Sequence, residues 1–69
     1  MSQYLVVIEQ GENGYGAYSP DLPGCAVVGE TVEEVERLMQ EAIAFHIEGL
    51  RAKGQPVPEP SSSVRYMAV

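Results

Sequence analysis

The chain begins with a run of apolar residues whose side chains would fall on both faces of a strand. Residues 3–9 read Gln-Tyr-Leu-Val-Val-Ile-Glu, and Tyr, Val and Ile favour extended structure. Alternate positions give one face Tyr4, Val6 and Ile8 and the opposite face Leu5 and Val7. A strand that is apolar on both sides is typical of one that is covered on both sides. We therefore predict a strand over residues 3–9.

Two further short strands are predicted before the first helical pattern. Asn13-Gly14 is a strong hairpin signal, since both residues tolerate a positive φ, and it predicts that residues 15–19 return beside the first strand. Residues 20–24 contain two prolines, which lack a backbone N–H, and so predict a turn. Cys25-Ala26-Val27-Val28 then reads as a third strand, which Gly29 and Glu30 end.

The best-defined element is an amphipathic helix over residues 32–53. Thr31 followed by Glu34 is a capping box, which satisfies the free amides of a helix N-terminus. At 100° per residue the apolar positions form one broad face, with Val35, Met39, Ala42 and His46 near its centre. Gly54 is a natural helix stop, and the prolines that follow prevent continuation.

The order of the predicted elements indicates one small α+β domain over residues 1–69. Three prolines favour an extended connector over residues 54–63, and residues 64–69 read as a last strand. We predict a two-layer β-β-β-α-β sandwich, with one helix on one face of a mostly antiparallel sheet. One helix covers only one face, and the sequence leaves open which one. The bare face should therefore meet a partner or further copies of the chain in a homo-oligomer, a dimer or a tetramer, and the expected contacts are Leu5, Val7 and Tyr66. The alternative is a sheet curled tightly enough to shield its own outer face.

Charge and composition exclude several classes of function. The 69 residues hold 4 Lys and Arg against 10 Asp and Glu, a net charge of −6. Without a basic cluster, direct binding to DNA or RNA is not expected. One Cys and one His cannot form an internal disulfide or a structural zinc site. No apolar run approaches the length of about 20 residues that spans a bilayer, and no basic region precedes the first apolar stretch, so we expect a cytoplasmic protein.

The residues that could carry chemistry favour binding over catalysis. His46 lacks a sequence-local partner and is expected to be structural, and Cys25 is expected to be a small buried apolar residue. The carboxylates do not converge from strands as a metal-dependent nuclease requires. Asp21 could form an Asx turn or meet a basic partner, and Tyr15 and Tyr18 could be sheet-face aromatics or interface anchors. We predict no enzyme, no cofactor and no metal site.

Several segments together resemble the N-terminal domain of HicB-type antitoxins. They are Pro-Asp-Leu-Pro-Gly-Cys at 20–25, Gly-Glu-Thr-Val-Glu-Glu at 29–34, the helical run 41–50, and Gly54 with Pro56 and Pro58. The resemblance extends from the first strand to Val69. It implies a truncated RNase H-like fold, which agrees with the predicted order of elements.

The resemblance also implies a partner and a function. The partner would be a small basic toxin of the HicA type, an mRNA interferase, which the antitoxin inhibits by covering its RNA-binding surface. We assign the expected partner contacts to Tyr15, Tyr18, Asp21, Leu22 and Glu30. Longer members add a C-terminal DNA-binding domain; this sequence ends at Val69, so we expect a solitary short member without direct DNA binding. The alternative is a solitary homo-oligomeric domain with another protein or ligand partner and no toxin.

Overall fold

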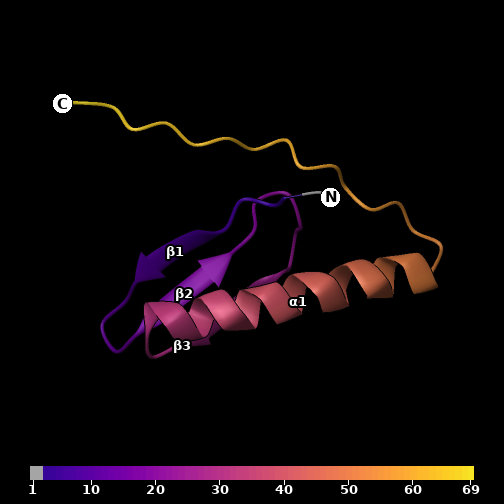
Figure 1. Cartoon of the computed structure of the whole chain (residues 1–69), viewed down its shortest axis with the longest axis horizontal. Coiled ribbons are helices and arrows are strands. Elements are labelled where there is room, and N and C mark those ends of the chain that lie inside the picture. Colours follow the sequence, from indigo (N-terminus) through magenta and orange to yellow (C-terminus); the bar gives the residue numbers. More distant parts are fainter. Residues whose placement is uncertain (1–2) are drawn as a thin grey trace.

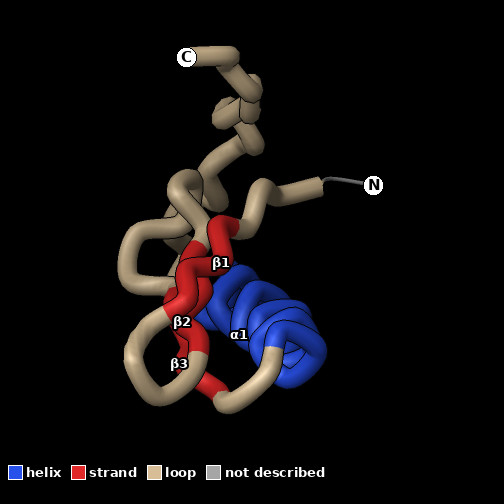
Figure 2. Tube along the Cα trace, turned by 90° about the vertical axis from the view of Figure 1, so that its left-hand side faces the viewer, coloured by secondary structure: helices blue, strands red, loops and turns tan. Residues whose placement is uncertain are grey.

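Three short strands and one long helix form the regular structure of residues 3–69, the part of the chain that the computed structural model describes. The elements are β1 (Val7–Gln10), β2 (Tyr15–Tyr18), β3 (Ala26–Gly29) and α1 (Val32–Ala52). The strands form an antiparallel sheet in the order β1-β2-β3, and α1 packs on one face of it (Figures 1 and 2). The predicted α+β arrangement is confirmed.

The first strand is shorter than predicted because its neighbour ends early. Val7 pairs with Tyr18, and this is the last pair that β1 makes with β2. Beyond Tyr18 the chain turns away: Ser19 donates its N–H to the carbonyl of Cys25, and Leu22 donates to the carbonyl of Ser19. Pro20 has no N–H to offer to a ladder. Residues 4–6 therefore precede the paired strand.

The hairpin between β1 and β2 has a four-residue loop, Gly11–Gly14, closed by a hydrogen bond from the Gly11 N–H to the Gly14 carbonyl at 2.7 Å. Gly14 has a positive φ of 157°, whereas Asn13 does not, so this is a wider turn than Asn-Gly alone predicts. A Cβ on Gly14 would lie 2.5 Å from the carbonyl oxygen of Gly29. The backbones of Gly14 and Gly29 therefore approach each other closely.

Both ends of α1 carry the caps that the sequence predicts. The Thr31 hydroxyl accepts the N–H of Glu34 at 3.1 Å, and the Glu34 carboxylate accepts the N–H of Glu30 at 2.8 Å. At the other end Gly54, with φ 69°, donates to the carbonyl of Arg51, and Gln55 donates to that of Leu50. This paired pattern is a Schellman motif, which satisfies the last carbonyls of a helix.

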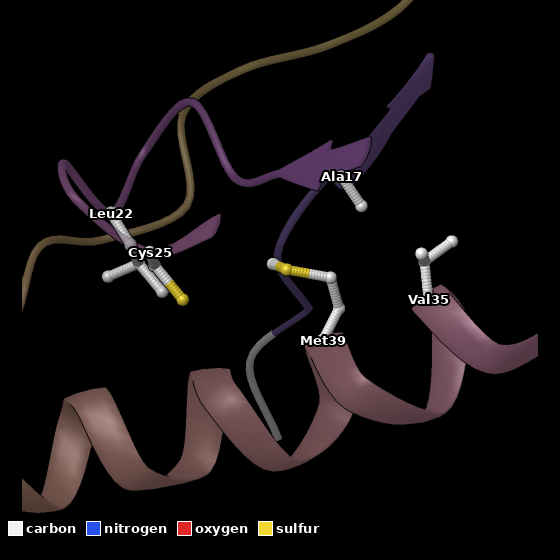
Figure 3. Packing of buried hydrophobic residues seen from close by; sticks show 5 residues of the cluster. All are labelled: Ala17, Leu22, Cys25, Val35 and Met39. Carbon is white, nitrogen blue, oxygen red and sulfur yellow. The ribbon is translucent and has the colours of Figure 1, made fainter. Parts of the chain in front are cut away.

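The core lies between α1 and the sheet face that carries Tyr4, Val6 and Ile8. Its buried members are Ala17, Leu22, Cys25, Val35 and Met39 (Figure 3). Tyr4, Val6 and Ile8 pack against this cluster, which answers the question of which face the helix covers. The helix packs chiefly against β3 and β2 rather than against β1, so the β1 side of the layer is less completely filled.

The fourth strand predicted at residues 64–69 is not formed. Residues 55–69 contain no regular element and leave the body of the domain as an extended segment (Figure 1). A strand needs a neighbouring backbone to pair with, and the residues that precede 64–69 form hydrogen bonds with side chains instead of with a strand. The Tyr4 hydroxyl donates to the Pro58 carbonyl at 2.6 Å, and Asp21 binds Ser61 and Ser62. The chain beyond Ser62 is exposed.

Candidate protein-binding surfaces

The sheet has a second face, opposite α1, which we call the outer face. Side chains alternate along a strand, so the residues between those in the core point outward. Val7, Tyr18 and Ala26 form one cross-strand row, and Glu9, Gly16 and Val28 form the next. Leu5 continues the alternation before β1, and neither it nor Val7 belongs to the core cluster.

The outer face is apolar and accessible. Val28 is 79% exposed and Tyr18 is 40% exposed, Ala26 is exposed, and Val7 is half-buried. Residues 3–69 contain one helix, and it lies on the opposite face. Contiguous exposed apolar groups on a sheet are typical of an interaction surface. Glu9 supplies a carboxylate within this face.

The residues expected to contact a partner are divided among different environments. Tyr18 lies on the outer face, and Glu30 is exposed just before α1. Tyr15 is half-buried on the inner face, where it packs against the core. Leu22 has no exposed surface; the turn at residues 20–24 directs it inward, so it is a core residue and its side chain is out of reach of a partner.

Asp21 has a role that sequence reasoning missed. Its carboxylate accepts the N–H and hydroxyl of Ser61, each at 3.1 Å, and those of Ser62 at 3.1 and 2.8 Å. The hydrogen bonds from Ser62, with those from Ser61, lower the pKa of Asp21 from its ordinary value of 3.8. These bonds favour the ionised carboxylate. Asp21 therefore anchors the C-terminal segment to the β2–β3 loop.

A second apolar surface is the C-terminal segment, residues 63–69. Tyr66 is 95% exposed and Met67 is 79% exposed, and Val64 and Val69 are also exposed. Within this segment the Arg65 guanidinium donates a local hydrogen bond to the Val64 carbonyl at 2.9 Å. Tyr66, an expected oligomer contact, thus lies on this segment and not on the sheet.

A groove runs between β1 and α1 and has a volume of about 880 Å³. Its strand side is formed by Gln3, Tyr4, Val6 and Ile8, and its helix side by Met39 and Ile43 with Glu36, Arg37 and Gln40 at the polar margin. The apolar members belong to or pack against the core. The groove is open because α1 packs chiefly against β3 and β2 and leaves space beside β1.

The potentially reactive groups do not form a catalytic arrangement. Cys25 is buried, and burial raises the pKa of its thiol above the ordinary value, so it is a poor nucleophile. His46 is half-buried on α1. Within residues 3–69 no three His, Cys, Asp or Glu side chains are grouped so that they could hold a metal ion. In the same part of the chain, no helix combines the length and the apolarity that crossing a membrane requires.

Comparison with known proteins identifies the family. Residues 4–68 match the model of the HicB-like antitoxins of bacterial toxin-antitoxin systems. The chain belongs to this family. The match covers the outer face and the Asp21 anchor, all of the groove except Gln3, and all of the C-terminal segment except Val69.

Similar curated proteins come from a phage and from bacteria. The chain is 39% identical over 67 residues to a UPF0150 protein of Synechocystis, covering 96% of this chain and 85% of that protein. It is 36% identical over 64 residues to an uncharacterised 14.9 kDa protein of Haemophilus phage HP1, covering 93% of this chain. Here it spans 48% of the relative's length, so the phage protein is about twice as long.

A solved structure agrees with the family assignment. A chain from a structure titled "HicA3 and HicB3 toxin-antitoxin complex" superposes on this one with a TM-score of 0.74 and 35% sequence identity. The superposition covers 87% of this chain and 70% of the other. This HicB-like chain therefore shares both sequence and fold with a component of a toxin-antitoxin assembly.

Proposed function

We propose that this HicB-like domain is a cytoplasmic antitoxin that binds a small basic HicA-type mRNA interferase and inhibits it by covering the toxin's RNA-binding surface. The observation that carries the proposal is the family match over residues 4–68. The similarity to a chain of a toxin-antitoxin complex supports it. Inhibition of this kind is stoichiometric and needs no catalytic group on the antitoxin.

The outer face is the surface that best fits such a partner. Its centre is apolar, with Tyr18 and Val28 accessible, and buried tyrosines are frequent anchors of protein interfaces. The chain carries a net charge of −6, which would attract a basic protein and speed its approach. The negative charge of the chain complements a basic surface that binds RNA, and the apolar centre of the outer face supplies the area that packs against it.

Substitution on the outer face tests the proposal against a matched control. Val28→Arg places a cation at the centre of the outer face, where Val28 is 79% exposed. Phe45→Arg makes the same change on α1, where Phe45 is 78% exposed. We expect Val28→Arg to weaken binding of the toxin by about tenfold or more, the effect of losing a central interface contact. Phe45→Arg should leave the affinity within about twofold of the unsubstituted chain.

The measurement uses a HicA-type toxin, sought as a small basic protein in the reading frame adjacent to that of this chain. Calorimetry gives the affinity of each variant, and an RNA-cleavage assay shows whether binding suppresses the toxin. Circular dichroism confirms that both variants keep the helix. If the unsubstituted chain neither binds this protein nor protects RNA, the antitoxin proposal is wrong. The alternative, a homo-oligomeric domain with another partner and no toxin, would then be preferred.

A further inference from the structure

The unpaired edge of β1 is a place where another strand can add. Among residues 3–69 the sheet order is β1-β2-β3, so within this part of the chain β1 pairs with β2 alone. The backbone N–H and carbonyl groups on its other side are therefore available to a further strand. The groove between β1 and α1 lies along this side, with Val6 and Ile8 on one wall and Met39 and Ile43 on the other. A strand added to β1 would bury alternate side chains in this groove.

The C-terminal segment has the properties of the strand that this edge lacks. Residues 63–69 are extended and exposed (Figures 1 and 2). Alternation places Met67 and Val69 with Arg65 on one side, and Val64 and Tyr66 on the other. A strand of this kind offers apolar side chains to the groove and to the outer face at the same time. Its seven residues reach about 23–25 Å when extended, comparable with the length of residues 4–10 beside which they would lie.

The Asp21 anchor of the segment lies in the β2–β3 loop, and among the described residues the segment makes no strand pairing with β1 of its own chain. Asp21 binds Ser61 and Ser62, and Asp21 lies in the loop between β2 and β3. Pro56, Pro58 and Pro60 precede this anchor, and a stretch with alternating prolines is stiff and extended. With the anchor closed, residues 63–69 project from the body of the molecule (Figure 2). They are therefore presented to a molecule that approaches from outside.

We infer that two copies of this chain exchange their C-terminal segments, each inserting residues 63–69 along β1 and the groove of the other. Each chain has an unpaired β1 edge with an open groove, and an exposed segment that can fill such a groove. In a twofold dimer each segment therefore fills the groove of the other chain. The exchange supplies the fourth strand that the sequence predicts and that the single chain leaves unpaired. Arg65 gives the added strand a cation, and Glu36 supplies a carboxylate at the polar margin of the groove.

This inference concerns self-association and does not rest on toxin binding. Its contacts are the edge of β1 and the groove, whereas the proposed toxin surface is centred on Tyr18 and Val28 of the outer face. A negative result in the test of one proposal would not contradict the other. The test below is carried out with the chain alone, so that no toxin is needed.

A substitution in the segment, with its control on α1, tests the exchange by mass. Met67 and Phe45 are 79% and 78% exposed, so Met67→Asp and Phe45→Asp each add one charge at an equally accessible apolar position. Light scattering of the full-length chain should give twice the 7.5 kDa monomer mass. We expect Met67→Asp to weaken the dimer by at least about tenfold in dissociation constant, and Phe45→Asp to leave it unchanged. A monomeric unsubstituted chain, or equal effects of the two substitutions, would overturn the inference.

Cross-linking separates exchange from folding back within one chain. In a Cys25→Ala background, Met67→Cys is placed in one copy and Gln40→Cys, at the margin of the groove, in a second copy of different mass. A short bis-maleimide should join the two different copies. When both substitutions are in one chain, the product should again be a linked dimer. A linked monomer would show that the segment fills its own groove, and the exchange would be rejected.

Discussion

Asp21 and Ser62 are 41 positions apart in the sequence and are joined by two hydrogen bonds. The Ser62 N–H donates to Oδ2 of Asp21 at 3.1 Å, and the Ser62 hydroxyl donates to Oδ1 at 2.8 Å. Ser61 makes the same pair of bonds to the same carboxylate. One side chain in the β2–β3 loop therefore fixes the point at which the C-terminal segment leaves the domain.

Asp21→Ala should release this segment without unfolding the domain. The substitution removes all four acceptor contacts, while Ala17, Val35 and Met39 stay packed in the core. We expect the amides of Ser61 and Ser62 to lose their protection from hydrogen exchange, and the amides of α1 to keep theirs. Exchange measured by nuclear magnetic resonance, residue by residue, checks this prediction.

Glu59→Ala is the matched control for that experiment. Glu59 is an exposed acid in the same segment, and its removal takes away the same charge. Protection at Ser61 and Ser62 should be unchanged in Glu59→Ala. Equal loss in both variants would mean that net charge, and not the Asp21 contacts, controls the segment.

The same anchor should open in acid. The hydrogen bonds from Ser62 and Ser61 lower the pKa of Asp21 below its ordinary value of 3.8 in the folded chain. A carboxyl whose folded pKa is depressed contributes stability that is fully present above the unfolded pKa and is lost as pH falls through the folded value. We expect Ser61 and Ser62 to become mobile below about pH 3.8 and to be insensitive between pH 5 and pH 7. Backbone relaxation across this range provides the measurement, and Asp21→Ala should be mobile at every pH.

The elements with local signals were predictable from the sequence. Thr31, Glu34 and Gly54 are capping residues whose partners lie within four or five positions, so the bounds of the helix followed directly from the chain. The hydrophobic alternation of residues 4–8 indicated two faces. It could not show which face α1 covers, because that depends on the way in which Leu22 and Cys25 enter the core from a distant turn.

The parts that could not be predicted depend on long-range contacts. Asp21 read equally well as a turn residue or as an exposed acid, since nothing near it in sequence points to Ser61 or Ser62. Leu22 was expected at a surface, but its turn buries it. The pattern of residues 64–69 predicted a strand that is not formed, because the pattern does not show whether a neighbouring strand within the chain is available. Val28, which is 79% exposed on the outer face, could have been found from its alternation with Val27.

Ser19→Ala should stabilise the domain. Ser19 is 3% exposed, and its hydroxyl has no hydrogen-bond partner among the described residues. Its backbone bonds to Cys25 and Leu22 do not involve the hydroxyl and would remain. Because a buried unsatisfied polar group costs about 1–3 kcal/mol, we expect the free energy of unfolding to rise by about 1 kcal/mol. Urea denaturation measures this, with Ser63→Ala at an exposed serine as the control that should change little. A loss of stability in Ser19→Ala would mean that the hydroxyl has a partner.

Alanine at two glycines should change stability in opposite directions. At Gly14 a Cβ would lie 2.5 Å from the Gly29 carbonyl oxygen, and φ is 157°; the clash is with backbone, which cannot move aside without disturbing the ladder between β2 and β3. We expect Gly14→Ala to cost about 1–3 kcal/mol. At Gly49, within α1, a Cβ meets nothing within 4 Å, and alanine favours the helix by about 0.5–1 kcal/mol.

Both glycine variants are compared by urea denaturation at one fixed protein concentration, since the stability of a self-associating chain depends on concentration. The midpoint should fall for Gly14→Ala and rise for Gly49→Ala with similar slopes, because neither changes the surface exposed on unfolding. If Gly14→Ala were neutral, the hairpin loop would have to move away from β3 in solution. Gly14 and Gly29 would then not lie close together, and the hairpin loop would not flank the outer face near Val28.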